Sequence, residues 1–225
     1  MNSLLLRSLA GLLFLLAILA LCLFLPAGSL AYWQAWVFLA VFGVCVAGVT
    51  IYLFRFDQGL LGRRVEAGPG AEVDPTQKVI QAAASLFFIL LFIIPGFDYR
   101  FHWSNVPPAA VIISDAVVAL GLFIVFLVFR ENSYTSATVQ VAAEQKVVSS
   151  GPYAVVRHPM YSGALLMLLF VPFALGSWVA APFVLPMFLV IGLRLLNEEK
   201  TLLAHLPGYA AYCQRVRYHL VPWIW

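Results

Sequence analysis

The sequence predicts an all-α integral membrane protein with about six transmembrane helices. Two features of composition support this fold class. The 225 residues are 63% hydrophobic and only 10% charged, whereas soluble domains carry about 25% charged residues. The mean hydropathy is +0.96, and apolar segments of roughly bilayer length recur along the chain. We expect a single membrane domain overall, with four transmembrane helices in residues 1–130 and a C-terminal region, residues 131–225, that also carries polar clusters.

Six segments approach the length of about 20 mostly apolar residues that a bilayer-spanning helix needs. The first resembles a signal sequence, but its apolar run is too long for one, and we expect a retained helix. The last two are separated only by Gly176-Ser177-Trp178, which predicts a tight antiparallel helical hairpin. Pro172, Pro182 and Pro186 are expected to kink this hairpin. The six predicted spans are Leu9–Leu25, Trp33–Phe54, Val79–Phe97, Ala109–Phe129, Tyr161–Leu175 and Val179–Leu196.

Shorter elements are predicted between and after the spans. Gln58–Val65 is expected to form an interfacial helix, and the polar connection 131–156 an ordered segment on the membrane face. Near the C-terminus, Tyr209, Tyr212 and Val216 share one face of a helical pattern, which indicates an amphipathic helix on the inner membrane surface.

The distribution of Lys and Arg predicts the orientation. If the N-terminus is cytoplasmic, Arg100 is the one basic residue among 13 that falls in an outer connection. Because cytoplasmic loops carry the excess of Lys and Arg, we expect a multi-pass protein with both termini in the cytoplasm. The basic residues do not line one face, so no nucleic-acid partner is expected.

Two polar clusters stand at the boundaries of the last two spans. The first is the stretch from Gly151 to Gly163, which contains Arg157-His158-Pro159. Pro159 favours the first turn of a helix and pushes His158 out of helical geometry, so His158 is expected just before a helix N-terminus that attracts anionic groups. The second contains Arg194 with Glu198 and Glu199. Both clusters could simply be lipid anchors and surface ion pairs, but the two Tyr residues beside His158 could also flank a cation.

Several classes of site are not expected. No histidine or cysteine has a partner at metal-ligand spacing, so no metal is predicted. The sequence also lacks the glycine-rich fingerprint of a soluble nucleotide-binding fold.

The C-terminal part, from about Tyr134 on, resembles the isoprenylcysteine carboxyl methyltransferase family and its bacterial relatives. The first four spans match nothing diagnostic. The resemblance is specific through its combination of motifs. These are Gly151-Pro152-Tyr153, Arg157-His158-Pro159-Met160-Tyr161-Ser162-Gly163, Arg194 followed by Glu198-Glu199, and then Tyr209, Tyr212, Val216 and Pro222.

The resemblance implies a membrane methyltransferase that uses S-adenosyl-L-methionine, with residues 131–225 as the cofactor-binding region. Gln145, Lys146 and Val147 would line the adenosine end of the cofactor. Gly151, Tyr153, His158, Pro159 and Tyr161 would contact it at the His-Pro turn, and Glu198 or Glu199 would hold its ribose or amino group. Arg194 would orient the acceptor, and Arg194, Glu199 and His158 are the expected catalytic residues. The acceptor would be a lipophilic small molecule or a prenylated substrate, and membrane lipids are the other expected partners. The methyl group would go to a carboxylate or to a lipid amine.

Two alternatives remain open at this point. An NADPH-dependent sterol or steroid reductase has a similar C-terminal pattern, which Tyr212-Cys213 fits, although Met160 and the Glu198-Glu199 doublet favour methyl transfer. A non-enzymatic transporter or assembly factor is the other alternative. Transporters carry ionisable groups or broken helices near the membrane midplane in matched halves, and no such repeat is visible here.

Overall fold

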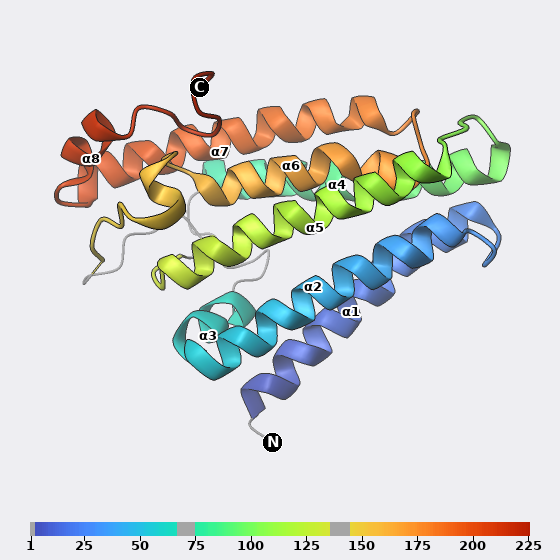
Figure 1. Cartoon of the computed structure of the whole chain (residues 1–225), viewed down its shortest axis with the longest axis horizontal. Coiled ribbons are helices and arrows are strands. Elements are labelled where there is room, and N and C mark those ends of the chain that lie inside the picture. Colours follow the sequence, from blue (N-terminus) through green and yellow to red (C-terminus); the bar gives the residue numbers. More distant parts are fainter. Residues whose placement is uncertain (1–2, 67–74, 136–144) are drawn as a thin grey trace.

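The computed structural model describes residues 3–66, 75–135 and 145–225, and every regular element within them is a helix. Figure 1 shows the helices lying lengthwise beside one another, as expected for a membrane bundle. The bounds are α1 (Ser3–Ala27), α2 (Trp33–Phe56), α3 (Gln58–Glu66), α4 (Pro75–Phe101), α5 (Pro108–Glu131), α6 (Pro159–Ala174), α7 (Val184–His205) and α8 (Tyr209–Arg215), with short 3₁₀ turns η1 (Gly151–Ala154) and η2 (Ala181–Phe183).

Five of these helices are long and apolar enough to cross a membrane, namely α1, α2, α4, α5 and the segment that contains α7. The remaining predicted span corresponds to α6, which has 16 residues. At 1.5 Å per residue, such a helix is shorter than a hydrocarbon core of about 30 Å. The all-helical membrane fold is therefore confirmed, and α6 is a short apolar helix packed inside it.

The hairpin of α6 and α7 has a longer connection than the sequence suggested. Gly176 supports the turn after α6 with a φ of +73°, and η2 follows, so that α7 begins at Val184 and not at Val179. Pro182 lies in η2, and Pro186 lies in the first turn of α7, where a proline costs no intrahelical hydrogen bond. The expected kinks at these two positions were wrong for that reason. Pro172 alone of the three lies inside a helix.

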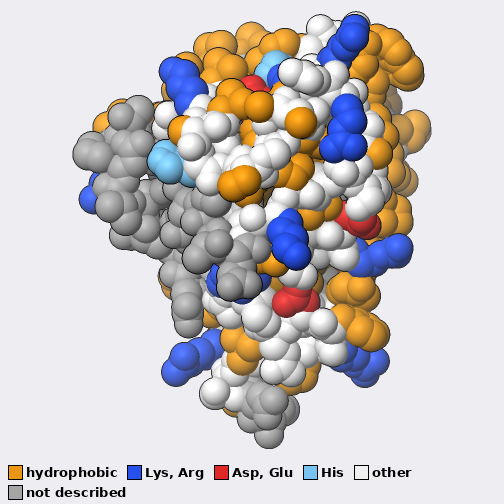
Figure 2. All heavy atoms as spheres, turned by 90° about the vertical axis from the view of Figure 1, so that its left-hand side faces the viewer, with side chains coloured by type: hydrophobic (Ala, Val, Ile, Leu, Met, Phe, Trp, Pro, Cys, Tyr) orange, Lys and Arg blue, Asp and Glu red, His pale blue; other side chains and the backbone are white. Residues whose placement is uncertain are grey.

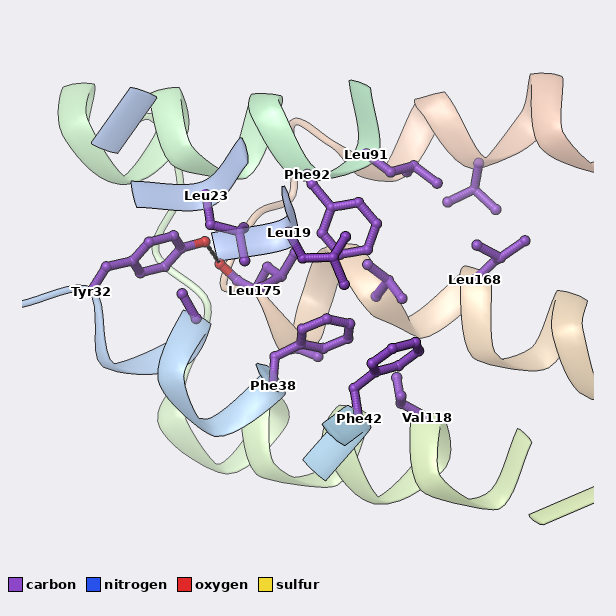
Figure 3. Close-up of a cluster of buried hydrophobic side chains, with 14 of the residues drawn as sticks. Leu19, Leu23, Tyr32, Phe38, Phe42, Leu91, Phe92, Val118, Leu168 and Leu175 are labelled. Atoms are coloured by element: carbon purple, nitrogen blue, oxygen red, sulfur yellow. Dashed lines mark hydrogen bonds between the residues drawn. The ribbon is translucent and has the colours of Figure 1, made fainter. Parts of the chain in front are cut away.

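The interior is filled by apolar side chains from α1, α2, α4, α5, α6 and α7 (Figure 3). Phe38 and Phe92 lie side by side with ring centroids 5.6 Å apart, and both are almost fully buried. Tyr32 donates its hydroxyl proton to the carbonyl of Leu175, which ties the start of α2 to the end of α6. This cluster fixes the frame that carries the polar residues at one end of the bundle.

Two glycines bring α5 and α6 into direct backbone contact. A Cβ added at Gly121 would lie 2.6 Å from the carbonyl oxygen of Gly163, and a Cβ added at Gly163 would lie 2.7 Å from that of Gly121. Small residues at such crossings let membrane helices approach closely. The start of α6, which contains the His-Pro motif, is thereby held firmly against α5.

The polar elements gather at one end of the molecule. The helices α3 and α8 and the turn η1 lie toward the left in Figure 1. Figure 2 views that end and shows several Lys and Arg side chains with few acidic ones. The helix predicted at Gln58–Val65 is confirmed as α3, and its place at the membrane interface stays a prediction. Of the predicted ordered connection 131–156, residues 136–144 lie outside the described residues.

Candidate active site

The His-Pro motif forms the start of α6 as its sequence predicted. Pro159 is the first helical residue, and His158 precedes it with non-helical backbone angles (φ −125°, ψ 62°). The imidazole makes no capping hydrogen bond, and His158 is buried. The imidazole of His158 therefore does not cap α6; its Nε2 instead lies near the carboxylate of Glu199. The first backbone N–H groups of α6 have no partner within the helix, as at any helix N-terminus.

A cleft opens beside this turn. It contains about 820 Å³ of empty space, part of which is open to solvent. Its walls come from the end of α5, the connection before η1, the start of α6, the end of α7 and α8. The predicted cofactor residues that line it are Gln145, Lys146, Val147, Tyr153, His158, Pro159, Tyr161 and Glu198.

Tyr161 joins the two predicted polar clusters. Its hydroxyl donates a 2.6 Å hydrogen bond to Oε2 of Glu198 and accepts one of 3.2 Å from Nε of Arg194. Arg194 is not itself a wall of the cleft. It acts on the cleft through Tyr161, and the guanidinium and the carboxylate together fix the direction of the phenol.

Tyr153 is fixed on the other side of the cleft. Its hydroxyl accepts a 3.0 Å hydrogen bond from the side-chain amide of Asn132, and its backbone carbonyl accepts one of 2.8 Å from the hydroxyl of Tyr212. Burial raises the pKa of Tyr153 to about 12, so the phenol is neutral at physiological pH. The cleft therefore offers neutral aromatic rings beside one carboxylate.

Glu199 lies behind the cleft in a buried ionic cluster. Its Oε1 is 2.9 Å from Nε of Arg157 and 3.7 Å from Nε2 of His158, while its Oε2 is 2.8 Å from Nε2 of His219. Glu199 is not a wall of the cleft. Although the cluster contains two histidines and a carboxylate, no group that could hold a metal ion is found in the described part of the chain.

The same cluster fastens the C-terminal segment onto the His-Pro turn. The backbone N–H groups of Arg157 and His158 donate 2.9 Å hydrogen bonds to the carbonyls of Tyr218 and His219. Ser162 adds a 2.6 Å bond from its hydroxyl to the carbonyl of Leu220. Burial lowers the pKa of His219 from its usual value despite the adjacent carboxylate. The segment after α8 is thus part of the site's framework.

Gly151 occupies a different place from the one predicted for it. It lies in η1 but does not line the cleft. Its φ is +55°, and an added Cβ would lie 2.9 Å from Oε2 of Glu131. A glycine is required here by the backbone and by the nearby carboxylate.

The sequence did not reveal that α8 contributes to the cleft. Tyr209 and Tyr212 are buried walls of it, although they were interpreted as part of a helix on the membrane surface. The Tyr209 hydroxyl is buried without a hydrogen-bond partner in the described structure. Their spacing of three residues was visible, but a pattern cannot distinguish a face that packs on protein from one that packs on lipid. Further walls that were not predicted are Asn132, Tyr134, Thr135, Val148, Arg157, Met160, Thr201, Leu202 and Leu206.

The fold is that of a multi-pass membrane protein with a cleft at one end of its bundle, and one region of the chain is similar to a known family. Residues 109–208 match the family model described as phospholipid methyltransferase. This region contains η1, α6, α7 and nearly all of α5, and every residue that lines the cleft except Tyr209 and Tyr212.

The fold is also similar to a solved structure of the eukaryotic intramembrane Ras methyltransferase, isoprenylcysteine carboxyl methyltransferase, determined without a monobody. The TM-score is 0.51 at 19% sequence identity, and the match covers 92% of this chain and 73% of that one. No match was found among curated protein sequences. Residues 109–208 thus resemble the phospholipid methyltransferase family, and the chain shares the fold of the isoprenylcysteine carboxyl methyltransferase structure; both similarities agree with the resemblance noted in the sequence.

Proposed function

We propose that the protein transfers a methyl group from S-adenosyl-L-methionine to a lipophilic acceptor at the cytoplasmic face of a membrane. The observation that carries this proposal is the convergence of Tyr153, Tyr161, His158 and Glu198 on one cleft. The cytoplasmic orientation rests on the distribution of Lys and Arg, with Arg100 near the opposite end of the bundle from the cleft.

The residues of the cleft fit the proposed cofactor. S-adenosyl-L-methionine supplies an electrophilic methyl group on a positively charged sulfur. Aromatic faces and a carboxylate attract a cation, and the cleft has Tyr153 and Tyr161 together with Glu198. Gln145, Lys146 and Val147 form the wall that would take the adenosine end. The N-terminus of α6 would attract the carboxylate of the amino-acid end.

Positioning accounts for most of the expected catalysis, because methyl transfer needs the acceptor atom in line with the bond that breaks. Glu198 and Arg194 orient the Tyr161 hydroxyl from opposite sides. Glu199 would act indirectly, since its contacts with Arg157 and His219 hold the turn that presents His158. The predicted catalytic role of Glu199 is therefore proposed as one of positioning.

The acceptor is either a carboxylate or an amine. A carboxylate is ionised at neutral pH and attacks through its own oxygen, so the site need only orient it, and Arg194 supplies a planar guanidinium for that purpose. An amine must lose a proton, for which His158 or Glu198 is within the cleft. In either case the lipophilic part of the acceptor would remain between the helices.

Ligand binding tests this proposal. We expect detergent-purified protein to bind S-adenosylhomocysteine, the product of methyl transfer, and not NADPH. Binding should weaken in Tyr153→Ala, which removes an aromatic wall of the cleft, and should be unchanged in Arg55→Ala, an exposed residue at the same end of the bundle. If the protein binds NADPH and does not bind S-adenosylhomocysteine, the methyltransferase proposal is wrong and a reductase function takes its place.

A further inference from the structure

Arg64 is a cation that the N-terminal half of the chain brings to the site. It lies in α3, outside the region that matches the family model. Its neighbour Arg63 is exposed and donates to the carbonyl of Ser133. Arg64 is instead half-buried and points toward the start of α6, where its Nη2 donates a 3.2 Å hydrogen bond to the sulfur of Met160. Met160 is a wall of the cleft.

The partners of Arg64 are weak ones for a guanidinium. Its second contact is the ring of Phe129, whose centroid lies 4.5 Å from the central carbon. A thioether is a poor acceptor, and the buried Nε has no hydrogen-bond partner in the described structure. No ion pair with Arg64 forms within the described residues. A buried charge without an anionic partner is costly, and the described residues of the chain leave Arg64 able to accept an anionic ligand.

The surroundings of Arg64 place that partner beside the reaction site. Burial lowers the pKa of Arg64, and the charge of Arg194 lowers it further, while Tyr161, Tyr153 and Glu198 oppose the change. These are the residues around which the cleft is built. Arginine stays protonated under such conditions. The link by contact is Met160, which accepts from Arg64 and is itself a wall of the cleft, so a negative group bound at Arg64 would lie next to the cleft.

We propose that Arg64 binds an oxyanion of the lipophilic acceptor, either its carboxylate or its phosphate. The proposal rests on the proposed methyl transfer and adds that the acceptor carries a negative group at the membrane boundary. It also assigns the N-terminal helices a part in choosing the acceptor, because α3 is held by α1 and α2.

Binding of matched charged and neutral probes tests the role of Arg64. The carboxylate pair is N-acetyl-S-farnesylcysteine and its methyl ester, and the phosphate pair is dioleoyl phosphatidic acid and dioleoylglycerol. Dissociation constants are measured by tryptophan fluorescence of detergent-purified protein without cofactor. We expect the wild type to prefer the charged member of one pair, and Arg64→Ala to reduce that preference by about tenfold to a hundredfold. The pair that responds identifies the oxyanion.

Two further variants make the result specific. Arg64→Lys keeps the charge without the planar fork and should give an intermediate preference, and it serves if the alanine variant does not fold. Arg55→Ala should bind as the wild type does. Equal weakening of charged and neutral probes would show that Arg64 only packs, and an unchanged preference in Arg64→Ala, or no preference in the wild type, would overturn the proposal. S-adenosylhomocysteine binding is measured in parallel, so that failure of the methyltransferase proposal is seen separately.

Discussion

The hydroxyl of Tyr161 donates a 2.6 Å hydrogen bond to Glu198, and these two walls of the cleft come from helices α6 and α7. This bond joins the two polar clusters that the sequence separates by more than thirty residues. It gives the cleft one oriented carboxylate, and the proposed binding of a cationic cofactor depends on it.

Neutralising Glu198 should weaken cofactor binding. Because hydrogen bonds to charged groups contribute about 1.5–3 kcal/mol, we expect Glu198→Gln to raise the dissociation constant for S-adenosyl-L-methionine at least about tenfold. Isothermal titration calorimetry on purified protein measures this change. Lys200→Gln, an exposed position on the same helix, is the matched control. Unchanged affinity in Glu198→Gln would remove Glu198 from the cofactor site.

Replacing Glu199 should reduce stability more than affinity. Its carboxylate is buried between Arg157 and His219, and removing one partner of a buried ion pair costs about 3–5 kcal/mol. We expect Glu199→Ala to lower the thermal unfolding midpoint clearly in detergent. A double variant with Arg157→Ala should lose less than the sum of the two single changes. Additive losses would show that the two residues do not act as a pair.

Acidification should loosen the C-terminal segment through His219. Burial lowers its pKa in the folded state, so the unfolded chain binds the proton more readily, and stability rises with pH across this interval. The contribution is therefore complete above the usual histidine pKa of about 6.5 and declines as the pH falls below it. Thermal midpoints between pH 5 and 8 should show this decline, and His219→Gln should flatten it. An equal decline in that variant would assign the effect to another group.

The glycine contact between α5 and α6 should resist enlargement. An added Cβ at Gly121 meets the carbonyl oxygen of Gly163 at 2.6 Å, and overpacking of this kind costs about 1–3 kcal/mol. Gly121→Ala should therefore lower the thermal midpoint and displace the start of α6. Gly48→Ala, where nothing lies within 4 Å, should leave the midpoint unchanged or raise it. A stable, fully active Gly121→Ala variant would contradict the close packing.

Loss of the Arg194 guanidinium should impair use of the acceptor more than it weakens cofactor binding. If Arg194 orients an acceptor carboxylate, Arg194→Ala should reduce acceptor use by about 2–4 kcal/mol in kcat/KM and leave S-adenosylhomocysteine affinity nearly intact. Steady-state kinetics at saturating cofactor separates the two effects. Equal loss of cofactor and acceptor binding would count against the assigned role.

The sequence predicted the helical frame because hydrophobic length and proline position act locally. Pro159 marked the start of α6 correctly, and α3 appeared within one residue of its expected bounds. The partners of the polar residues depend on how distant helices meet, and no local pattern contains that information. His219 seemed partnerless in the sequence but pairs with Glu199 across the fold, and Arg64 was counted only as a basic loop residue.

Transfer of a labelled methyl group tests the central claim most directly. Native membranes are incubated with purified protein and S-adenosyl-L-methionine carrying a radiolabelled methyl group, and are then separated into lipid and protein fractions. We predict protein-dependent label in a lipid or lipid-modified fraction, reduced strongly by Glu198→Gln and unaffected by Lys200→Gln. If adding the purified protein increases the radiolabel in neither the lipid fraction nor the protein fraction, the account is contradicted.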